Sequence, residues 1–425
     1  MDYANLTAMQ GEMDKCVRCA ACQAGCPTYE ASFSETLSAR GRIKIASALL
    51  KGALVPSERI ATDFDMCLSC MRCAQACPAN IDTISVFQAA RAEMRAIKGD
   101  NFIQDFIFKR ILPYPSRLNV MAKAVGLASI VYDYAPDWLA NLLPYSAEGK
   151  RRATPAFLQT NLRSRIAGMK NKPKPGPDGK RIKVAYFSGC MTDLTFPSTG
   201  VKVVEALEKA GAEVVYPEGQ VCCGAPAWFA GDNDTARMLA DRNMETFASL
   251  DVEAVAVSCA TCGSVLKHIL PRLAANKERA QAIAAKVVDF QKLIVSMGLE
   301  RVIQKAGGQK LKVTYHDPCH LSRGLGERQA PRELLKSLPD VEYIEMDGAD
   351  VCCGGSGAFA LTNYETAVEF GKFKAEAVKN SGAAIVATSC PSCQLQLQDS
   401  LNRAGVDALA VHTADIIEYR PEAKS

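Results

Sequence analysis

The sequence predicts an α+β multidomain protein, with a helical N-terminal domain followed by two repeated α/β domains that each contain a parallel sheet. The 18 cysteines of the 425-residue chain fall into two four-cysteine runs and then two copies of a five-cysteine pattern. The second half alternates short apolar runs with helical patterns, which is typical of a parallel sheet. At about 100–200 residues per domain, we expect an N-terminal domain (1–100), a helical and basic linker region (101–180) and two α/β domains (181–305 and 306–425).

Composition and charge indicate a folded protein. Apolar residues make up 48% and charged residues 23% of the chain, both close to the averages of globular proteins. The first residues lack a basic start followed by an apolar run, and no apolar stretch reaches the length of a membrane span. We therefore expect a cytoplasmic protein, in which cysteines bind metals rather than form disulfides. A net charge of +4 gives little reason to expect a nucleic-acid partner.

Each N-terminal cysteine run has the spacing C-x2-C-x2-C-x3-C-P. The runs are Cys16, Cys19, Cys22 and Cys26 before Pro27, and Cys67, Cys70, Cys73 and Cys77 before Pro78. Two-residue gaps let a tight turn aim three thiolates at one cubane cluster, and in two-cluster ferredoxins the fourth cysteine ligates the other cluster. We therefore expect two [4Fe-4S] clusters, one held by Cys16, Cys19, Cys22 and Cys77, the other by Cys67, Cys70, Cys73 and Cys26.

Two zinc sites are the alternative for these runs, because four-cysteine zinc sites also use C-x2-C pairs. Zinc sites rarely combine three evenly spaced cysteines with a Cys-Pro pair. The two runs are separated by a stretch in which 38–51 and 83–98 show helical spacing. The N-terminal part therefore resembles the helical ferredoxin domain of respiratory dehydrogenases more than a free ferredoxin.

The second half of the chain contains a duplicated five-cysteine module. The first module (181–305) has Cys190, Cys222, Cys223, Cys259 and Cys262, and the second module (306–425) has Cys319, Cys352, Cys353, Cys390 and Cys393. Equivalent cysteines are 129 to 131 positions apart, and five matched positions at a near-constant offset indicate an internal repeat.

The cysteines of each module follow predicted strands. Apolar alternating runs end at Cys190, Cys259, Cys319 and Cys390, and helical patterns lie between them at 199–210, 234–249, 332–337 and 365–380. Ligands gather beyond the carboxyl ends of the strands in such sheets, so the five sulfurs of a module can converge on one site. Several of these cysteines also lie near predicted helix N-termini, where the dipole favours the thiolate.

Five cysteines per site fit neither a tetrahedral zinc site nor a set of disulfides, whereas a multi-iron cluster can use five. The competing interpretation is a thiol–disulfide centre at the two C-x2-C pairs, Cys259/Cys262 and Cys390/Cys393. That interpretation leaves the other three cysteines of each module unexplained.

From Cys16 to Cys393 the sequence resembles the CCG cysteine-rich family, and within it the iron–sulfur subunits of bacterial glycolate oxidase and D-lactate dehydrogenase. The iron–sulfur subunit of anaerobic glycerol-3-phosphate dehydrogenase and the subunits of heterodisulfide reductase are related. The resemblance implies one further four-iron cluster per module, of the non-cubane type in the heterodisulfide reductase branch. Both modules carry the full five-cysteine pattern.

The resemblance also implies a partner. Oxidation of a 2-hydroxy acid is flavin chemistry, yet no G-x-G-x-x-G follows a predicted strand here, so we expect neither flavin nor NAD on this chain. The expected function is to pass electrons from an FAD-containing glycolate or D-lactate dehydrogenase subunit to quinone or another carrier. The alternatives are a subunit that reduces a disulfide at the five-cysteine sites, a glycerol-3-phosphate dehydrogenase iron–sulfur subunit, and a zinc-stabilised scaffold without redox activity.

Two histidines, His316 and His320, flank Cys319, where the first module has Phe187 and Met191. Because histidine titrates near neutrality, they are candidate proton donors for a substrate near the second module. The alternative is that they only cap the ends of a strand and a helix.

The linker region is a candidate for peripheral membrane contact. Residues 101–147 are rich in apolar and aromatic side chains, and eleven Lys or Arg against one acidic residue lie between 150 and 183. Anionic lipid attracts such side chains by about 1 kcal/mol each, which could hold the protein on the inner face of the cell membrane. The alternative is that the apolar segment packs against protein while the basic stretch stays solvated.

Overall fold

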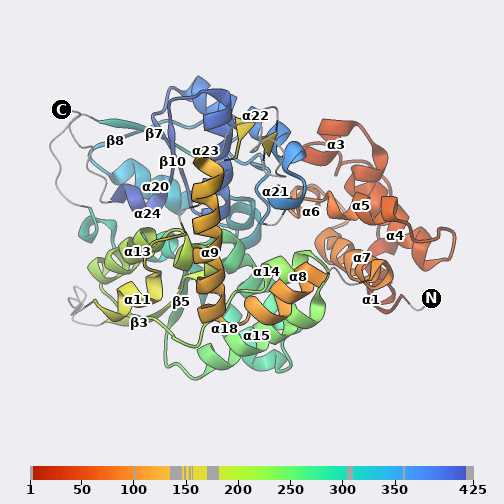
Figure 1. Cartoon of the computed structure of the whole chain (residues 1–425), viewed down its shortest axis with the longest axis horizontal. Helices are drawn as coiled ribbons and strands as arrows, with labels where there is room; N and C mark the ends of the chain where they lie inside the picture. The colour runs from red at the N-terminus through yellow and green to blue at the C-terminus, as the bar shows by residue number, and fades with distance from the viewer. Residues whose placement is uncertain are drawn as a thin grey trace.

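The computed structural model of the protein describes residues 3–99, 102–134, 146–147, 150–152, 155, 157–169, 181–303, 310–357 and 359–417. The N-terminal helices gather at one side of the molecule, and the two α/β modules occupy the rest (Figure 1). None of the described helices is both long enough and apolar enough to cross a bilayer.

Between residues 3 and 99, the regular structure of the N-terminal domain is entirely helical. Its elements are α1 (Ala4–Ala8), α2 (Gln10–Asp14), α3 (Pro27–Ser32), the 3-10 helix η1 (Glu35–Leu37), α4 (Ala39–Leu50), α5 (Glu58–Asp65), α6 (Arg72–Gln75) and α7 (Thr83–Lys98). The apolar faces of α4, α5 and α7 form a common core that includes Ile43, Phe64 and Phe87. The helices predicted over 38–51 and 83–98 are confirmed, and each begins after a side-chain cap, Ser38 or Asp82.

Residues 102–169 run from this domain to the first module. They form α8 (Phe102–Phe106), the π-helix η2 (Ile107–Ile111), α9 (Pro115–Tyr134), a short antiparallel pair β1 (Ser146–Ala147) and β2 (Lys150–Arg151), and α11 (Leu162–Ala167). In Figure 1, α9 crosses the front of the modules, and it contacts the first module at α12 (Gly189–Leu194). The proline-rich part of the predicted linker, 173–177, lies outside the described residues.

Both modules contain a four-stranded parallel sheet with the same strand order. The order is β4-β3-β5-β6 in the first module and β8-β7-β9-β10 in the second. The first sheet consists of β3 (Ile182–Phe187), β4 (Ala212–Val215), β5 (Ala254–Val257) and β6 (Val287–Asp289). The second consists of β7 (Leu311–Tyr315), β8 (Val341–Tyr343), β9 (Ile385–Thr388) and β10 (Leu409–His412). The predicted repeat of a parallel α/β unit is therefore confirmed.

Helices cover both sheets. In the first module these are α12, α13 (Pro197–Ala210), α14 (Ala225–Phe229), α15 (Asn233–Ala248), α16 (Ala260–Ser264), η3 (Val265–Ile269), α17 (Leu270–Leu273), α18 (Lys277–Lys286), α19 (Phe290–Met297) and η4 (Leu299–Arg301). In the second they are η5 (His320–Leu325), α20 (Gln329–Ser337), α21 (Phe359–Thr362), α22 (Tyr364–Ser381), α23 (Pro391–Ala404) and α24 (Thr413–Ile417). The central strands are buried and apolar, as parallel strands covered by helices must be.

Equivalent buried residues stabilise the two modules. The Tyr186 hydroxyl lies 2.7 Å from the Ser258 hydroxyl in the first module, and Tyr315 lies 2.9 Å from Ser389 in the second. Each serine comes just before a C-x2-C pair and is fully buried. The hydrogen bonds hold the loops that carry these cysteines against the strand ends.

The modules pack against each other through those same loops. The backbone N–H of Ala260 donates to the Ser389 carbonyl at 3.1 Å, and the Gln291 amide donates to the Ser389 hydroxyl at 2.6 Å. In the opposite direction, His412 makes a 2.8 Å hydrogen bond to the Ser258 carbonyl. The end of each module thus supports the cysteine loop of the other.

Candidate metal centres

The first cysteine run surrounds a pocket near the surface of the N-terminal domain. The pocket is lined by the first three cysteines of this run together with two cysteines of the second run: Cys16, Cys19, Cys22, Cys73 and Cys77. Cys77 lies at this pocket, and so does Cys73, which is predicted to ligate the other cluster, so the exchange of fourth cysteines stays a prediction. Cys19 is exposed, whereas the other cysteines of the first run are half-buried or buried.

The backbone around both runs adopts the same tight turns. Arg18 and Ala20 in the first run have φ of +60° and +66°, and Ser69 and Met71 at the equivalent places of the second have +51° and +61°. Non-glycine residues rarely occupy this left-handed region, and they cluster where a ligand site constrains the chain. The repeated conformation turns successive thiols toward one point, which suits a cubane cluster.

The second run lies deeper. Burial raises the pKa of Cys73 to about 12, and the charges of Cys67 and then of Cys26 add to this effect. Both Cys26 and Cys22 of the first run therefore lie near Cys73, so the two runs adjoin each other at this point. The buried guanidinium of Arg91 donates to the Cys67 carbonyl at 2.6 Å and to the Phe64 carbonyl at 2.8 Å, which fixes the loop that carries this run.

In the first module, the five cysteines form one connected group at the carboxyl edge of the sheet. Cys190 Sγ lies 3.8 Å from Cys222 Sγ. Cys222 contacts Cys223, which contacts Cys262, and Cys262 contacts Cys259. Before Cys190, Gly189 has φ of +70°, and a Cβ there would lie only 2.7 Å from Cys262 Sγ, so the chain approaches the sulfurs as closely as glycine allows.

The second module repeats this group. Cys319 contacts Cys352, which contacts Cys353, and Cys393 contacts both Cys353 and Cys390. The predicted convergence of five sulfurs per module therefore matches their placement. Ten buried or half-buried thiols in two compact groups form a donor set that suits soft, iron-containing clusters.

The thiols do not become thiolates through the helix dipole alone. Cys259 and Cys319 cap α16 and η5, as the sequence led us to expect. Contact with Cys352 and burial nevertheless raise the pKa of Cys319. Cys262 lowers the pKa of Cys259, but Cys390 and burial raise it by more. A bound cation favours the thiolate, so metal binding is coupled to proton release at these sites.

The four cysteine groups lie in a continuous series. Burial raises the pKa of Cys70, and the charge of Cys319 raises it further, because the second N-terminal run adjoins the second module. Cys390 of the second module in turn contacts Cys259 of the first. The series therefore runs from the first run through the second run and the second module to the first module.

Charged side chains join the N-terminal domain to the second module at this point. The carboxylate of Asp350 accepts hydrogen bonds from Arg72 at 2.7 Å and from Arg323 at 3.1 Å. Arg323, whose side chain is only 3% exposed, also donates to the Cys70 carbonyl at 3.3 Å. These residues were not predicted, because nothing in their local sequence indicates partners some 250 positions away.

The two histidines beside Cys319 have different surroundings. His320 Nδ1 lies 3.6 Å from Cys319 Sγ, and its ring packs on Phe229 of the first module. Burial lowers the pKa of His320, but Cys319 and other cysteines raise it by more. Burial, reinforced by the charge of Lys374, lowers the pKa of His316 well below its usual value, so the form that could donate a proton as imidazolium is disfavoured there.

Lys374 is a further residue that sequence reasoning missed. It is fully buried in α22, and its ammonium donates to the carbonyls of Gly348 and Ala349 at 2.6 and 3.0 Å. Burial lowers the pKa of Lys374 to about 8. A signal was present, since Lys374 interrupts the apolar face of the helix predicted over 365–380.

Models of two known protein families match the segments that contain these cysteines. The model of the cysteine-rich domain family matches residues 184–267 and 313–398, and that of the 4Fe-4S dicluster domain matches residues 12–81. These segments contain the five-cysteine groups and both N-terminal runs, respectively.

Three curated proteins illustrate the range of relatives. A probable glycolate oxidase iron–sulfur subunit of Bacillus subtilis is 31% identical over 96% of this chain and 94% of its own length. One subunit of the dihydromethanophenazine:CoB–CoM heterodisulfide reductase of Methanosarcina barkeri is 28% identical over 100% of this chain and 97% of its own. Lactate utilization protein A of Macrococcus caseolyticus is 33% identical over 57% of this chain and 98% of its own.

Proposed function

Because the chain belongs to the family of the glycolate oxidase iron–sulfur subunit, we propose that it is the electron-transfer subunit of a flavin-dependent 2-hydroxy-acid dehydrogenase. In this role it passes electrons from a partner flavoprotein, which oxidises glycolate or D-lactate, to quinone or another carrier. The relatives named for glycolate oxidation and lactate utilization support this substrate class.

The observation that carries the proposal is the continuous series of four cysteine groups. Each N-terminal run would hold one [4Fe-4S] cluster and each module one further four-iron cluster, with the ligand sets predicted from the sequence. Such clusters supply one-electron steps between a two-electron donor and its acceptor. The protein fixes their spacing, since Cys70 adjoins Cys319 and Cys259 adjoins Cys390.

The N-terminal end of the series is the end most open to a partner. Cys19 is exposed, and the neighbouring Val17 is 72% exposed. A redox partner could approach the first cluster there without unfolding any described element. The sulfurs of the two modules are more deeply covered.

The test is reduction of the purified chain with and without its flavoprotein. Anaerobically purified protein should contain up to about 16 iron atoms, given four per cluster. Glycolate or D-lactate should bleach its visible absorption only after a flavoprotein of the 2-hydroxy-acid dehydrogenase type is added. Stoichiometric flavin in the single chain, or bleaching by substrate alone, contradicts the proposal, and zinc with negligible iron ends every redox interpretation.

A second candidate function is reduction of a disulfide at the modules. The contact between Cys259 and Cys390 places the two five-cysteine sites side by side, where two electrons could be delivered to one substrate. The heterodisulfide reductase relative spans the whole chain. If the dithionite-reduced protein alone reoxidises on addition of low-molecular-weight disulfides, this candidate is favoured, and if its spectrum is unchanged it is rejected.

Peripheral membrane contact is a separate proposal. Phe102, Ile103 and Phe106 of α8 are 82%, 71% and 51% exposed, which suits contact with lipid or with a partner. Within the described part of the basic stretch, Arg152 is engaged by protein, because it donates to the Ala360 carbonyl at 2.6 Å and lies over the Tyr364 ring. Flotation of the assembled complex with anionic but not neutral vesicles supports contact through the basic residues, and no flotation with either rejects it.

A further inference from the structure

The side chain of His316 is buried without any of the hydrogen bonds that an imidazole normally makes. It follows the last residue of β7, and it is 1% exposed. Within the described part of the chain, neither Nδ1 nor Nε2 makes a hydrogen bond of normal geometry, although the Ala349 carbonyl lies near the ring. An unpartnered polar group in the interior costs about 1–3 kcal/mol. We therefore expect that a ring nitrogen of His316, which lies beside a cluster of thiols, binds a ligand.

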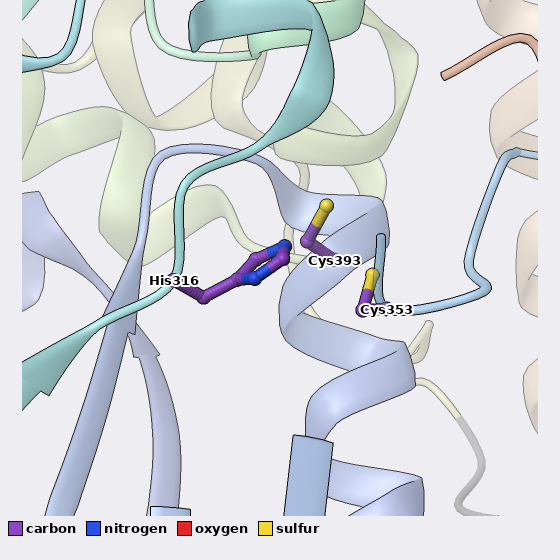
Figure 2. A group of neighbouring side chains, drawn as sticks. All are labelled: His316, Cys353 and Cys393. Carbon is purple, nitrogen blue, oxygen red and sulfur yellow. The ribbon is translucent and has the colours of Figure 1, made fainter. Parts of the chain in front are cut away.

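The ring faces two cysteine sulfurs of the second module. One ring nitrogen of His316 and the sulfurs of Cys353 and Cys393 all lie within 4.8 Å of one another. Figure 2 shows the imidazole extending from the end of its strand toward Cys393 on α23 and Cys353 on the loop below. Ligand atoms of one metal centre lie roughly 3.5–4 Å apart when their bonds to the metal are about 2.0–2.3 Å, so the three atoms are close enough for His316 to bind the same cluster as Cys353 and Cys393.

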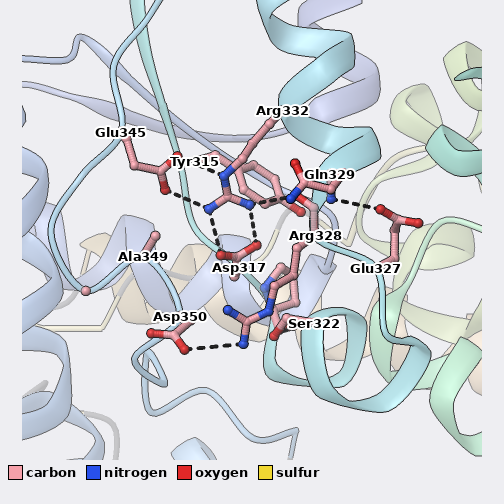
Figure 3. A network of polar contacts seen from close by, with 12 residues as sticks. Tyr315, Asp317, Ser322, Glu327, Arg328, Gln329, Arg332, Glu345, Ala349 and Asp350 are labelled. Atoms are coloured by element: carbon pink, nitrogen blue, oxygen red, sulfur yellow. Dashed lines mark hydrogen bonds and ion pairs between the residues drawn. The ribbon is translucent and has the colours of Figure 1, made fainter.

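Contacts at His316 and at the next residue fix the backbone that carries this ring. The backbone N–H of His316 donates to the Ala387 carbonyl at 2.9 Å. Figure 3 shows Arg332 reaching from α20 to both carboxylate oxygens of the next residue, Asp317, at 2.9 and 2.8 Å. A neutral imidazole carries a free lone pair on one of its two nitrogens, and this lone pair is what ligation needs.

The first module offers no such nitrogen. Phe187 occupies the position of His316, at the end of β3. The two modules also differ at Lys374 of α22. Gly224 faces the Ala236 carbonyl of α15 as Gly354 faces the Ala367 carbonyl of α22, so these two helices correspond residue by residue. Lys374 then takes the place of the neutral Asn243 of the first module.

We propose that a ring nitrogen of His316 is a ligand of the iron–sulfur cluster of the second module, beside Cys353 and Cys393. This inference rests on the proposed binding of a cluster by that module. His320 is not equivalent, since its ring is engaged by Cys319 and by Phe229. The second module would then differ from the first, which has cysteine ligands alone, by one additional neutral nitrogen ligand beside the same five thiolates.

Pulsed electron paramagnetic resonance of the anaerobically reduced full chain tests this ligand directly. The chain has only four histidines, so labelling with [15N]histidine reports on few sites. We expect a strongly coupled histidine nitrogen in the wild-type protein and in the matched control His320→Phe. The coupling should be lost in His316→Phe, which installs the residue of the first module.

A redox titration provides a second readout that does not depend on a resolved nitrogen signal. Replacing His316 by Cys should shift the midpoint potential of the second-module cluster downward, because a thiolate replaces the imidazole. Iron and sulfide analysis of each variant shows whether the cluster is still present. An unchanged potential in an iron-replete His316→Cys protein, or a histidine coupling that survives in His316→Phe, overturns the ligand assignment.

These measurements separate the inference from the function on which it rests. A wild-type chain with a full iron content but no histidine coupling rejects the nitrogen ligand and leaves the proposed electron transfer intact. A wild-type chain whose iron content accounts only for the two N-terminal clusters rejects the cluster in the second module itself, and with it both proposals.

Discussion

Replacement of Gly231 by Ala should loosen the contact between the N-terminal domain and the first module. Gly231 has φ of +83°, and a Cβ there would lie 2.8 Å from the carbonyl carbon and oxygen of Arg91 in α7. Around this point, the Gln88 amide donates to Asn233 at 3.4 Å and Arg95 lies 3.8 Å from Asp232. The close approach of glycine to a helix backbone therefore sets the spacing of this interface.

The free-energy cost of Gly231→Ala has two parts. Forcing an alanine into the left-handed region costs roughly 1–2 kcal/mol. Ordinary contact begins near 3.4 Å, whereas the new Cβ would meet the α7 backbone at 2.8 Å, and overpacking of this kind costs typically about 1–3 kcal/mol. Gly382 provides the matched control, because it has φ of +67° and open space around its Cβ. Gly382→Ala should therefore show the first cost only, and Gly231→Ala both.

Hydrogen exchange of the anaerobic protein, followed by mass spectrometry, measures the difference at α7. An extra cost of about 1–3 kcal/mol corresponds to roughly 5–150-fold faster exchange through opening of this interface. Peptides of α7 should therefore lose protection in Gly231→Ala and keep it in Gly382→Ala. Equal protection of α7 in the two variants would refute the argument that this contact sets the spacing.

Three further predictions address charge and ligation. Burial raises the pKa of Asp289 to about 7 from 3.8, so its contribution to stability is complete below about pH 4 and is lost as the pH rises through 7. Asp289→Asn should therefore flatten the fall in thermal midpoint between about pH 4 and 7 by an amount equivalent to roughly 4 kcal/mol. An unchanged slope contradicts the burial argument. Asp350→Asn removes the carboxylate that the buried Arg323 contacts, and it should destabilise the junction of the N-terminal domain with the second module by about 1–2 kcal/mol. The measured effect is faster proteolysis between the two. Asp347 is exposed, so Asp347→Asn is the charge-matched control and should leave the cleavage rate unchanged. Cys26→Ser should abolish the paramagnetic signal of the cluster assigned to the second run, and selective loss of the other N-terminal signal would show that the two runs do not exchange their fourth cysteines.

Much of the fold follows from local sequence signals. Strands β3 and β7 were expected because alternating apolar residues end at Cys190 and Cys319, and the structure places them at the centres of equivalent sheets. The edge strands β6 and β10 were not expected, since three or four residues of strand between helices carry little periodicity.

The site was predictable in its ligand types and much less in its connections. Regular cysteine spacing reports local turns, so the grouping of sulfurs within each run and module could be anticipated. The approach of Cys70 to Cys319, by contrast, depends on packing between distant segments and on the Arg323 contacts. The isolation of His316 from hydrogen-bond partners within the described residues is likewise a property of the folded interior, which no local motif encodes.

The mutual support of the two cysteine loops has a consequence for oxygen sensitivity. Ser258 and Ser389 are each contacted by the other module, and the cysteines that follow them, Cys259 and Cys390, are 7% and 2% exposed. Each module thus covers the cysteine sulfurs of the other. Separation of the two modules would expose both sites to dioxygen and to chelators at once, so the duplication protects the cysteine sites only while the two copies remain paired.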